Sequence, residues 1–257
     1  MQEYIKHLLI RTPVEKPLED IRWLLKFRQR LKHPELNEIY IEDKRIKQMM
    51  NQVINKSSNC LDIGCHLGSM LSEIMTLAPQ GNHIAVEALP YKTNLLKKKF
   101  PEVDIKQLAL GEKTGEVTFY LNTSRSGYSG LFPHNKQGDK IQEVTVKCEK
   151  LDNILFPEYQ VDFIKIDVEG AELSVFRGGE NMLRRYRPTI LFEFARSAFS
   201  KYDVTPSMMF EFLTEKHNYS IFLIKDFLEN VKPLSFEEFG SALKYPFKAF
   251  NFIASAR

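Results

Sequence analysis

Acidic residues stand in or at the ends of several short apolar runs of this sequence. Asp62 lies in one such run, and Glu87, Asp167 and Glu193 stand at or near the ends of three others. The first run leads into the turn 64–68, which reads Gly-Cys-His-Leu-Gly. Glycine lets a backbone approach a ligand closely, and the N-terminus of a following helix offers free N–H groups to an anion. The pattern therefore predicts a ligand site built from a glycine turn and several carboxyl groups.

The spacing in this turn favours a nucleoside over a dinucleotide. Gly64 and Gly68 form Gly-x-x-x-Gly, whereas the dinucleotide motif is Gly-x-Gly-x-x-Gly, and His66 occupies the middle position. Glu87 lies 19 residues after Gly68, where a carboxylate accepts hydrogen bonds from ribose hydroxyls. In the alternative interpretation, Asp62 and Glu87 are structural carboxylates that cap loops.

The elements that must position these residues follow a βαβ pattern, which is typical of a parallel sheet covered by helices. Apolar runs predict strands over residues 60–63, 83–87, 103–108, 161–167, 189–194, 219–224 and 250–254. Periodicity and capping signals predict helices over residues 42–55, 68–78, 90–100 and 170–178, in a stretch ending at 187, and from Pro206 after the N-cap Thr205. Residues 116–121 and 143–148 predict two half-buried strands joined by a long loop over 124–140, and residues 233–246 are interpreted as irregular.

The first 56 residues are predicted to form a helical extension before a domain over residues 57–257. A helix over residues 19–32 has Trp23, Phe27 and Leu31 on one side and basic residues on the other. Its apolar side is interpreted as a surface that docks on the main domain. The alternative is peripheral contact of the basic side with a membrane surface or a lipid-linked substrate.

Composition narrows the class of protein. The 257 residues are 43% hydrophobic and 27% charged, which excludes collagen-like, disordered and low-complexity chains. A net charge of +3 is too small to indicate a nucleic-acid partner, and no apolar run is long enough to span a bilayer. The three cysteines form neither a disulfide framework nor a zinc site by their spacing, so a cytoplasmic protein is expected. The oligomeric state is left open.

Several segments resemble the FkbM family of S-adenosylmethionine-dependent methyltransferases. They are residues 62–68, 86–90, 108–111, 114–119 and, above all, 163–172, which read Phe-Ile-Lys-Ile-Asp-Val-Glu-Gly-Ala-Glu. The resemblance covers roughly residues 57–255. It implies an α/β class I methyltransferase (Rossmann-like) fold, with a seven-stranded, mostly parallel sheet and helices on both faces. It also implies S-adenosylmethionine as cofactor and methylation of a hydroxyl group, often on a sugar, glycan, lipid-linked saccharide or macrolide.

The resemblance implies a role for each of several residues. The turn 64–68 would hold the methionine part of the cofactor, Glu87 its ribose and the pair Ala109-Leu110 its adenine edge. Asp167 would face both the sulfonium and the acceptor. The family more often has Ala-Asn where this chain has Cys65 and His66. The predicted cofactor-binding residues are Asp62, Gly64, Cys65, His66, Gly68, Glu87, Ala109, Leu110 and Asp167.

Methyl transfer is an in-line displacement that a positioned base assists by taking the proton of the attacking hydroxyl. Asp167 is the first candidate for this base, and Glu169 and Glu193 are the others. Asp167 and Glu169 are expected to raise each other's pKa or to share a divalent ion, so the use of a metal is left open. In the alternative, Asp167 orients the cofactor ammonium, Glu169 caps the next helix and Glu193 is structural. His66 is either a second base or a structural histidine.

The long loop is interpreted as a lid over the active site, with Tyr128, Ser129 and His134 as candidate substrate contacts. Tyr128 would stack on a sugar ring. The alternative is a disordered surface loop with a solvated His134. Two other functions are retained: a nicotinamide-dependent oxidoreductase, which the missing dinucleotide motif disfavours, and a catalytically silent scaffold that binds the cofactor or a glycan.

Overall fold

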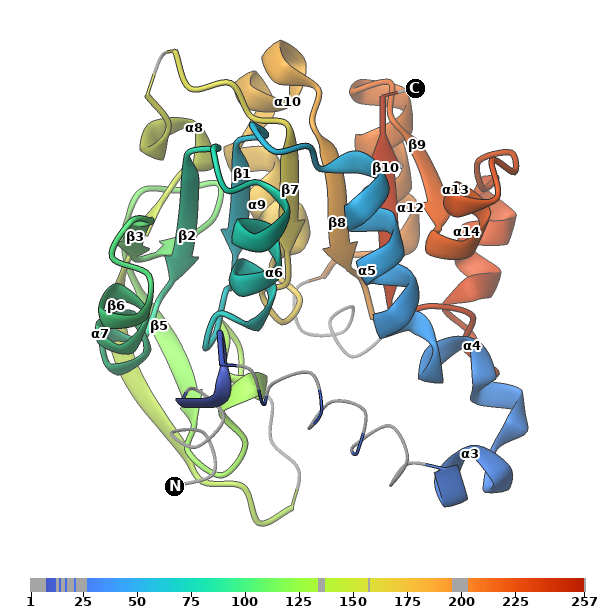
Figure 1. The fold of residues 1–257 in the computed structure, drawn as a ribbon, viewed down its shortest axis with the longest axis horizontal. Helices are drawn as coiled ribbons and strands as arrows, with labels where there is room; N and C mark the ends of the chain where they lie inside the picture. Colours follow the sequence, from blue (N-terminus) through green and yellow to red (C-terminus); the bar gives the residue numbers. More distant parts are fainter. Residues whose placement is uncertain are drawn as a thin grey trace.

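The main element is a seven-stranded sheet with strand order β3-β2-β1-β7-β8-β10-β9 (Figure 1). The computed structural model describes residues 8–12, 14, 17, 21, 27–133, 137–156, 158–195 and 203–256. Strand β10 runs antiparallel to both neighbours, and the other adjacent strands pair in parallel. The strands are β1 (Cys60–Ile63), β2 (His83–Glu87), β3 (Asp104–Gln107), β7 (Phe163–Ile166), β8 (Thr189–Glu193), β9 (Ser220–Leu223) and β10 (Asn251–Ser255). The class I methyltransferase fold expected from the resemblance is confirmed.

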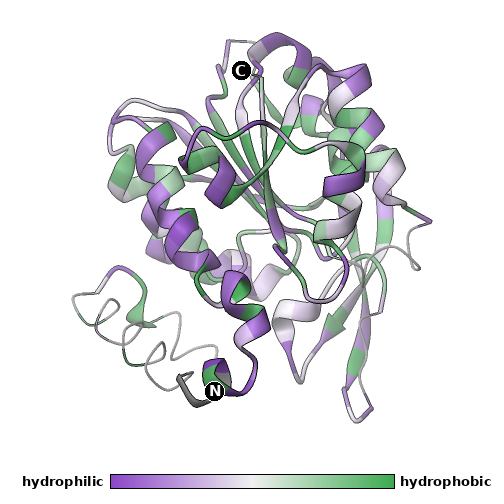
Figure 2. Ribbon diagram, turned by 90° about the vertical axis from the view of Figure 1, so that its right-hand side faces the viewer, coloured by the Kyte–Doolittle hydropathy of each residue, from purple (hydrophilic) through white to green (hydrophobic). Residues whose placement is uncertain are grey.

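Different helices cover the two faces of this sheet (Figure 1). One face packs against α5 (Glu42–Val53), α6 (Ser69–Leu77), α7 (Pro90–Lys99) and α13 (Ile224–Leu228). The other face packs against α8 (Leu151–Ile154), α9 (Glu172–Gly178), α10 (Glu180–Tyr186), α12 (Pro206–Glu211) and α14 (Phe236–Ala242). Because β1 and β7 are buried on both sides, they are apolar throughout except at Asp62 and Lys165. Figure 2 shows the resulting concentration of apolar residues along the central strands.

The structure confirms one of the helix predictions and corrects another. The predicted cap of α12 is confirmed, since the Thr205 side chain accepts a hydrogen bond from the N–H of Met208. The interpretation of residues 233–246 as irregular is wrong, because they contain α14. Its capping box pairs Ser235 with Glu238 and satisfies the first N–H groups of the helix. With seven residues, α14 is too short for a periodic pattern to reveal it.

A second, three-stranded sheet lies beyond the carboxyl ends of β2 and β3 (Figure 1). It consists of β4 (Ala109–Leu110), β5 (Gly115–Asn122) and β6 (Ile141–Glu149). The strands β5 and β6 were predicted from the sequence, and they pair antiparallel along their length. The segment between them contains the 3-10 turn η2 (Ser126–Tyr128) and a bridge between Tyr120 and Gly130. The small sheet therefore holds the predicted lid segment over the edge of the main sheet.

The extension enters the domain through α3 (Phe27–Lys32), η1 (Pro34–Leu36) and α4 (Asn37–Tyr40), which lead into α5. The Glu42 carboxylate fastens α5 to β10, because it accepts hydrogen bonds from the N–H groups of Phe250 and Asn251. Trp23 lies outside the described residues. Leu31 is 66% exposed because α3 points away from the sheet (Figure 1), so the predicted docking is wrong at this position. Among the helices described, none has the length and apolar character to cross a membrane. The boundary after residue 56 stays a prediction.

Candidate active site

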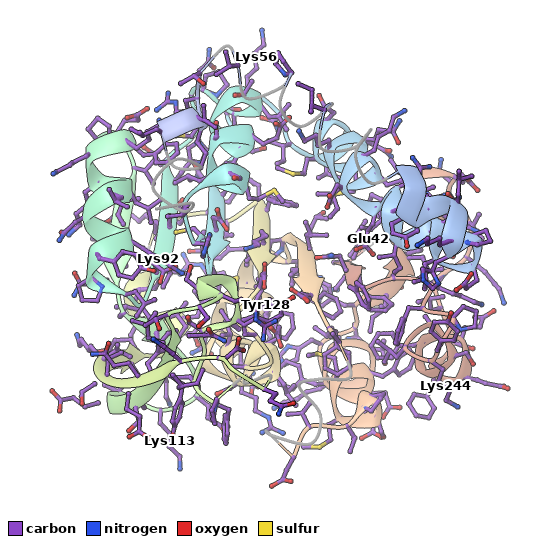
Figure 3. All side chains as sticks on the ribbon, turned by 90° about the horizontal axis from the view of Figure 1, so that it is seen from below. Glu42, Lys56, Lys92, Lys113, Tyr128 and Lys244 are labelled. Atoms are coloured by element: carbon purple, nitrogen blue, oxygen red, sulfur yellow. The ribbon has the colours of Figure 1, made fainter. Side chains whose placement is uncertain are left out.

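A cavity of about 480 Å³ opens at the carboxyl edge of the main sheet, between the ends of β1, β2, β7 and β8 and the lid segment. Parallel pairing places Ile63 beside Val86 and Ile166, so the residues that follow these strands converge. Figure 3 looks onto this edge, with Tyr128 near its centre and Lys92 on the α7 side. Ten predicted site residues line the cavity: Gly64, His66, Glu87, Ala109, Leu110, Tyr128, Ser129, Asp167, Glu169 and Glu193.

Three other predicted site residues, all among the described residues, do not line it. Cys65 is buried, with 4% of its surface exposed, and Asp62 has none exposed. Gly68 is the N-cap of α6 with a φ of 87°, and a Cβ atom there would lie 2.6 Å from the Phe100 ring. His134 lies outside the described residues. The roles of Asp62, Cys65 and Gly68 in cofactor binding stay predictions and would have to be indirect.

Gly64 is required by the protein itself. Its φ is 75°, and a Cβ atom on it would lie 1.8 Å from the carbonyl oxygen of Asp167. Only glycine lets the turn after β1 pass this close to the end of β7. The expected close backbone approach therefore occurs, but it brings together two strand ends, and the cavity forms beside them.

Lys165 links these two strand ends. It stands opposite Asp62 in the parallel register of β7 and β1, and its Nζ lies 3.5 Å from Oδ1 of Asp62. The same Nζ donates a hydrogen bond to the Gly64 carbonyl oxygen at 2.9 Å and lies 3.3 Å from Oδ2 of Asp167. Burial alone would lower the pKa of Lys165, but the charges of Asp167 and Asp62 raise it. The lysine is therefore a fixed cation beneath the cavity.

Lys165 lies in the segment 163–172 that resembles the FkbM family, but the sequence alone assigned it no role. The signal was available, since a lysine inside a fully buried apolar strand needs an acidic partner. Asp62, in the neighbouring strand, is that partner. Burial raises the pKa of Asp62, and the charge of Lys165 opposes this rise.

Three carboxyl groups converge at the β7 and β8 end of the cavity. Burial alone would raise the pKa of Asp167, but Lys165 and a hydrogen bond with Glu193 hold it below its usual value. Burial and the Asp167 charge raise the pKa of Glu193 to about 10. Two carboxyl groups form a hydrogen bond only when one of them is protonated, so Glu193 is the donor and Asp167 the acceptor. Burial, with the charges of Asp167 and Glu172, raises the pKa of Glu169 to about 8.

Glu172 holds the turn that carries these groups. Its Oε1 accepts hydrogen bonds from the N–H groups of Val168 and Gly170, at 3.1 and 3.0 Å. These N–H groups precede α9, whose N-cap is Ala171, so the bonds hold the turn and are not a helix cap. The alternative that Glu169 caps this helix stays a prediction. Glu169 itself has a φ of 56°, a left-handed conformation that residues other than glycine adopt rarely. The strained turn directs its carboxyl group to the cavity wall.

The opposite end of the cavity is partly apolar. Glu87 is 6% exposed, and its Oε1 accepts a hydrogen bond from the N–H of Leu89 at 2.9 Å. Its carboxyl group also accepts a hydrogen bond from the backbone of His66. Burial raises the pKa of Glu87 and the charge of Lys92 opposes this rise. The apolar wall beside this carboxyl group is formed by Val86, Ala88, Leu108, Ala109, Leu110 and Phe119.

The lid segment is fastened at both sides. Nε2 of His66 lies 3.0 Å from Oγ of Ser126, and Nζ of Lys92 donates to the Ser126 carbonyl oxygen at 3.2 Å. Where the lid segment leaves β5, the buried Asn122 accepts hydrogen bonds from the N–H groups of Ser124 and Arg125. Residues 123–133, which the structure describes, are therefore held by side chains of neighbouring segments, and the lid and the disordered loop both stay interpretations from the sequence. Lys92 and Asn122 were not predicted, because neither belongs to a recognisable motif.

The chemistry of the lining fits a cofactor with an adenosine and an amino-acid part. A carboxyl group at the end of β2 next to an apolar wall suits a ribose and an adenine ring. The carboxylate of Asp167 suits a cationic group at the other end. Within the described part of the chain, no three His, Cys, Asp or Glu side chains are arranged to hold a metal ion.

The family model described as methyltransferase FkbM domain matches residues 62–221. This span is more than half of the chain, which therefore belongs to the FkbM methyltransferase family, as its resemblance implied. The cofactor of this class is S-adenosylmethionine, so the predicted cofactor is confirmed. Membership of this family also means that the domain is a methyltransferase domain, and the alternative of a nicotinamide-dependent oxidoreductase is wrong.

The similar solved structures are distant in sequence. An FkbM methyltransferase from Methylobacillus flagellatus KT is 14% identical, with a TM-score of 0.50 over 79% of this chain, which spans 44% of that protein's length. A TehB-like SAM-dependent methyltransferase from Corynebacterium glutamicum is 13% identical, with a TM-score of 0.40, covering 93% of this chain and 97% of that one. The plantazolicin methyltransferase BpumL in complex with SAH is 11% identical, with a TM-score of 0.42, covering 99% and 95%. No curated protein matches the chain.

Proposed function

We propose that this protein transfers the methyl group of S-adenosylmethionine to a hydroxyl group of a saccharide or of a glycosylated or lipid-linked metabolite. The observation that carries this proposal is the group of three carboxyl side chains, Asp167, Glu169 and Glu193, at one end of the cavity. Carboxyl groups accept hydrogen bonds from hydroxyl donors and take up their protons. A site for this chemistry needs such a group next to the methyl donor.

The cofactor supplies a methyl group made electrophilic by a positively charged sulfur. We assign Glu87 to its ribose and the apolar wall around Ala109 and Leu110 to its adenine, because these residues line the cavity. Asp167 carries a negative charge that Lys165 maintains, so it suits the sulfonium and the acceptor side at once. Orientation of the two reactants in one cavity lowers the barrier by several kcal/mol.

The lid offers contacts for a polar acceptor. Tyr128 is 46% exposed, and the Arg125 guanidinium lies 4.4 Å from the centre of its ring. An aromatic ring with an exposed face suits the apolar side of a sugar ring, and the carboxyl groups suit its hydroxyls. Tyr128, Ser129 and the three carboxyl groups are therefore our candidates for acceptor contacts. His134 stays a candidate from sequence alone.

We place the reaction in the cytoplasm. All three cysteines, Cys60, Cys65 and Cys148, are free and buried. Buried free thiols are the usual state in a reducing compartment. Peripheral membrane contact of the basic segment around α3 is compatible with a lipid-linked acceptor.

The test is a search for the methylated product. The purified protein is incubated with S-adenosylmethionine carrying an isotopically labelled methyl group, with and without saccharide fractions, and products are identified by mass spectrometry. We expect a labelled species one methylene heavier than its precursor, on an oxygen of the carbohydrate part. Asp167→Asn is the matched negative control. A label on nitrogen or carbon, or cofactor binding without any product, would contradict the proposal and favour another acceptor or a silent scaffold.

A further inference from the structure

Ser126 joins the lid segment, residues 123–133, to the side of the cavity that we assign to the cofactor. Its hydroxyl forms a hydrogen bond with Nε2 of His66 at 3.0 Å, and its carbonyl oxygen accepts one from Nζ of Lys92 at 3.2 Å. Ser126 is 7% exposed and Lys92 is 2% exposed. Breaking such bonds away from water leaves polar groups unsatisfied, which is costly. Ser126 is therefore fixed by residues outside its own segment.

The two residues that hold Ser126 both act on Glu87, which we assign to the cofactor ribose. The Glu87 carboxyl group accepts a hydrogen bond from the backbone of His66, and the charge of Lys92 acts on the same group. Lys92 lies in the first turn of α7, which follows the strand that ends at Glu87. A continuous set of contacts therefore runs from Glu87 through His66 and Lys92 to Ser126.

The backbone at His66 has an uncommon conformation. Its φ is 51°, in the left-handed region, and it stands between Gly64 and Gly68, whose φ values are also positive. A residue strained in this way at a cavity wall is a feature of functional sites. The turn places His66 on the wall of the cavity and its Nε2 against the lid segment.

The cavity is lined both by the turn and by the lid segment. Gly64, His66 and Glu87 form part of one side, and residues 126–129 form part of another. A ligand shifts a conformational equilibrium only when it contacts the two states differently. A cofactor that fills this cavity meets residues 126–129 only when the segment is in place, so its binding favours that state.

We propose that His66 is a positioning residue that couples the cofactor turn to the lid segment, so that cofactor binding fixes Tyr128 and Ser129 for the acceptor. This inference rests on the proposed function, which assigns the acceptor to these two residues. His66 acts through Ser126, because Ser126 and Tyr128 belong to the same short turn, η2, and Ser129 follows it. Asn122 holds the start of the segment by separate bonds, so the bonds of Ser126 do not depend on it.

Hydrogen exchange of the lid segment measures this coupling without an acceptor. The purified protein is placed in deuterated buffer with and without saturating S-adenosylhomocysteine, and deuterium uptake in peptides covering residues 123–133 is followed by mass spectrometry. Coupling between two sites typically amounts to roughly fivefold to 150-fold, so we expect exchange in these peptides to slow by about fivefold or more. Peptides covering α14, on the far side of the sheet from α7, should exchange equally in both samples.

Two variants at position 66 separate the reach of the side chain from the shape of the turn. Asparagine adopts the left-handed region readily, but its amide ends closer to the backbone than Nε2 does. His66→Asn should therefore bind S-adenosylhomocysteine and lose most of the protection. Glutamine carries the same amide one methylene farther out, so His66→Gln should recover part of it. A role confined to the turn gives the opposite order, because asparagine tolerates this φ better than glutamine.

Ser126→Ala tests the other partner of the bond. It should reduce the protection in the unmodified protein and have no further effect in His66→Asn, because there the bond is already absent. His33→Asn and Ser57→Ala, at exposed positions, are the matched controls and should exchange like the unmodified protein. Circular dichroism and binding of S-adenosylhomocysteine show that each variant is folded.

The outcomes are distinct. Protection that is lost in His66→Asn, partly recovered in His66→Gln and insensitive to Ser126→Ala in His66→Asn supports this inference. Equal exchange with and without the ligand in the unmodified protein, protection retained in His66→Asn, no recovery in His66→Gln, or independent effects of the two positions overturns it and leaves the proposed function intact. Failure of the unmodified protein to bind S-adenosylhomocysteine overturns both.

Discussion

Lys165 and Asp62 stand opposite each other on β7 and β1, and their charged atoms lie 3.5 Å apart in the interior. The lysine also reaches the Gly64 carbonyl oxygen and the Asp167 carboxylate. One buried cation thus compensates a buried acid, fixes the glycine turn and keeps Asp167 ionised. The stability of the sheet centre and the charge of the active site depend on the same side chain.

Lys165→Met should therefore destabilise the fold and alter the site together. Removing one partner leaves buried carboxylates without compensation, which typically costs about 3–5 kcal/mol. We expect a loss of this order in the free energy of unfolding, measured by urea titration. The second change Asp62→Leu should restore part of it, because it removes the unpaired acid. Lys106→Met, at a partly exposed ion pair with Asp104 on β3, should cost less than about 1 kcal/mol. Equal losses in the two single variants would contradict this role of Lys165.

Gly64→Ala tests the contact between the two strand ends. The new Cβ would lie 1.8 Å from the Asp167 carbonyl oxygen at a φ of 75°, so β1 and β7 must separate. Overpacking of this kind costs about 1–3 kcal/mol, and the positive φ adds to it. We expect a thermal denaturation midpoint lowered by several degrees and weakened binding of S-adenosylhomocysteine. Gly127→Ala, where a Cβ meets no atom within 4 Å, is the matched control and should leave the midpoint nearly unchanged.

The sequence predicted the strands of the main sheet because most are short, continuous apolar runs bounded by polar turns. It also predicted ten of the residues that line the cavity, since the carboxyl ends of parallel strands share one edge. What it missed depends on partners far apart in the chain. Lys165 is informative only when its register with Asp62 is known. Asn122 holds the lid through hydrogen bonds to local backbone, and no spacing rule distinguishes it from an ordinary turn residue.

The pKa of Glu169 predicts how its charge affects stability. Its ordinary value is 4.5 and its value in the folded protein is about 8, so between these pH values the folded state binds the proton more tightly than the unfolded state. Stability is therefore lost as the pH rises through this window. Glu169→Gln cannot lose a proton, so it should become more stable than the unmodified protein by about 2–4 kcal/mol at pH 8.5, and the gain should be smaller at pH 5.5. Urea titrations at both pH values measure this, and a gain independent of pH would refute it.

Glu87→Gln tests the ribose contact. The carboxyl group accepts two backbone hydrogen bonds and lines the cavity beside the apolar wall. Hydrogen bonds to a charged group contribute about 1.5–3 kcal/mol, so the dissociation constant of S-adenosylhomocysteine should rise roughly tenfold to a hundredfold. Glu116→Gln, on the exposed side of β5, should bind normally. Unchanged affinity in Glu87→Gln would remove this residue from the cofactor site.

Asn122→Ala tests whether the lid acts on the acceptor. Asn122 is fully buried, and its side chain holds the N–H groups of Ser124 and Arg125 and donates to Asp139 at 2.9 Å. Without these bonds the start of the lid segment is no longer held to the small sheet, while Glu87 and the glycine turn keep their own contacts. We expect faster cleavage of the lid by a protease and a KM for the acceptor raised by about tenfold, with little change in cofactor affinity. Asn51→Ala, an exposed asparagine on α5, should change none of these. If Asn122→Ala weakened cofactor binding as much as acceptor binding, the lid would belong to the cofactor site instead.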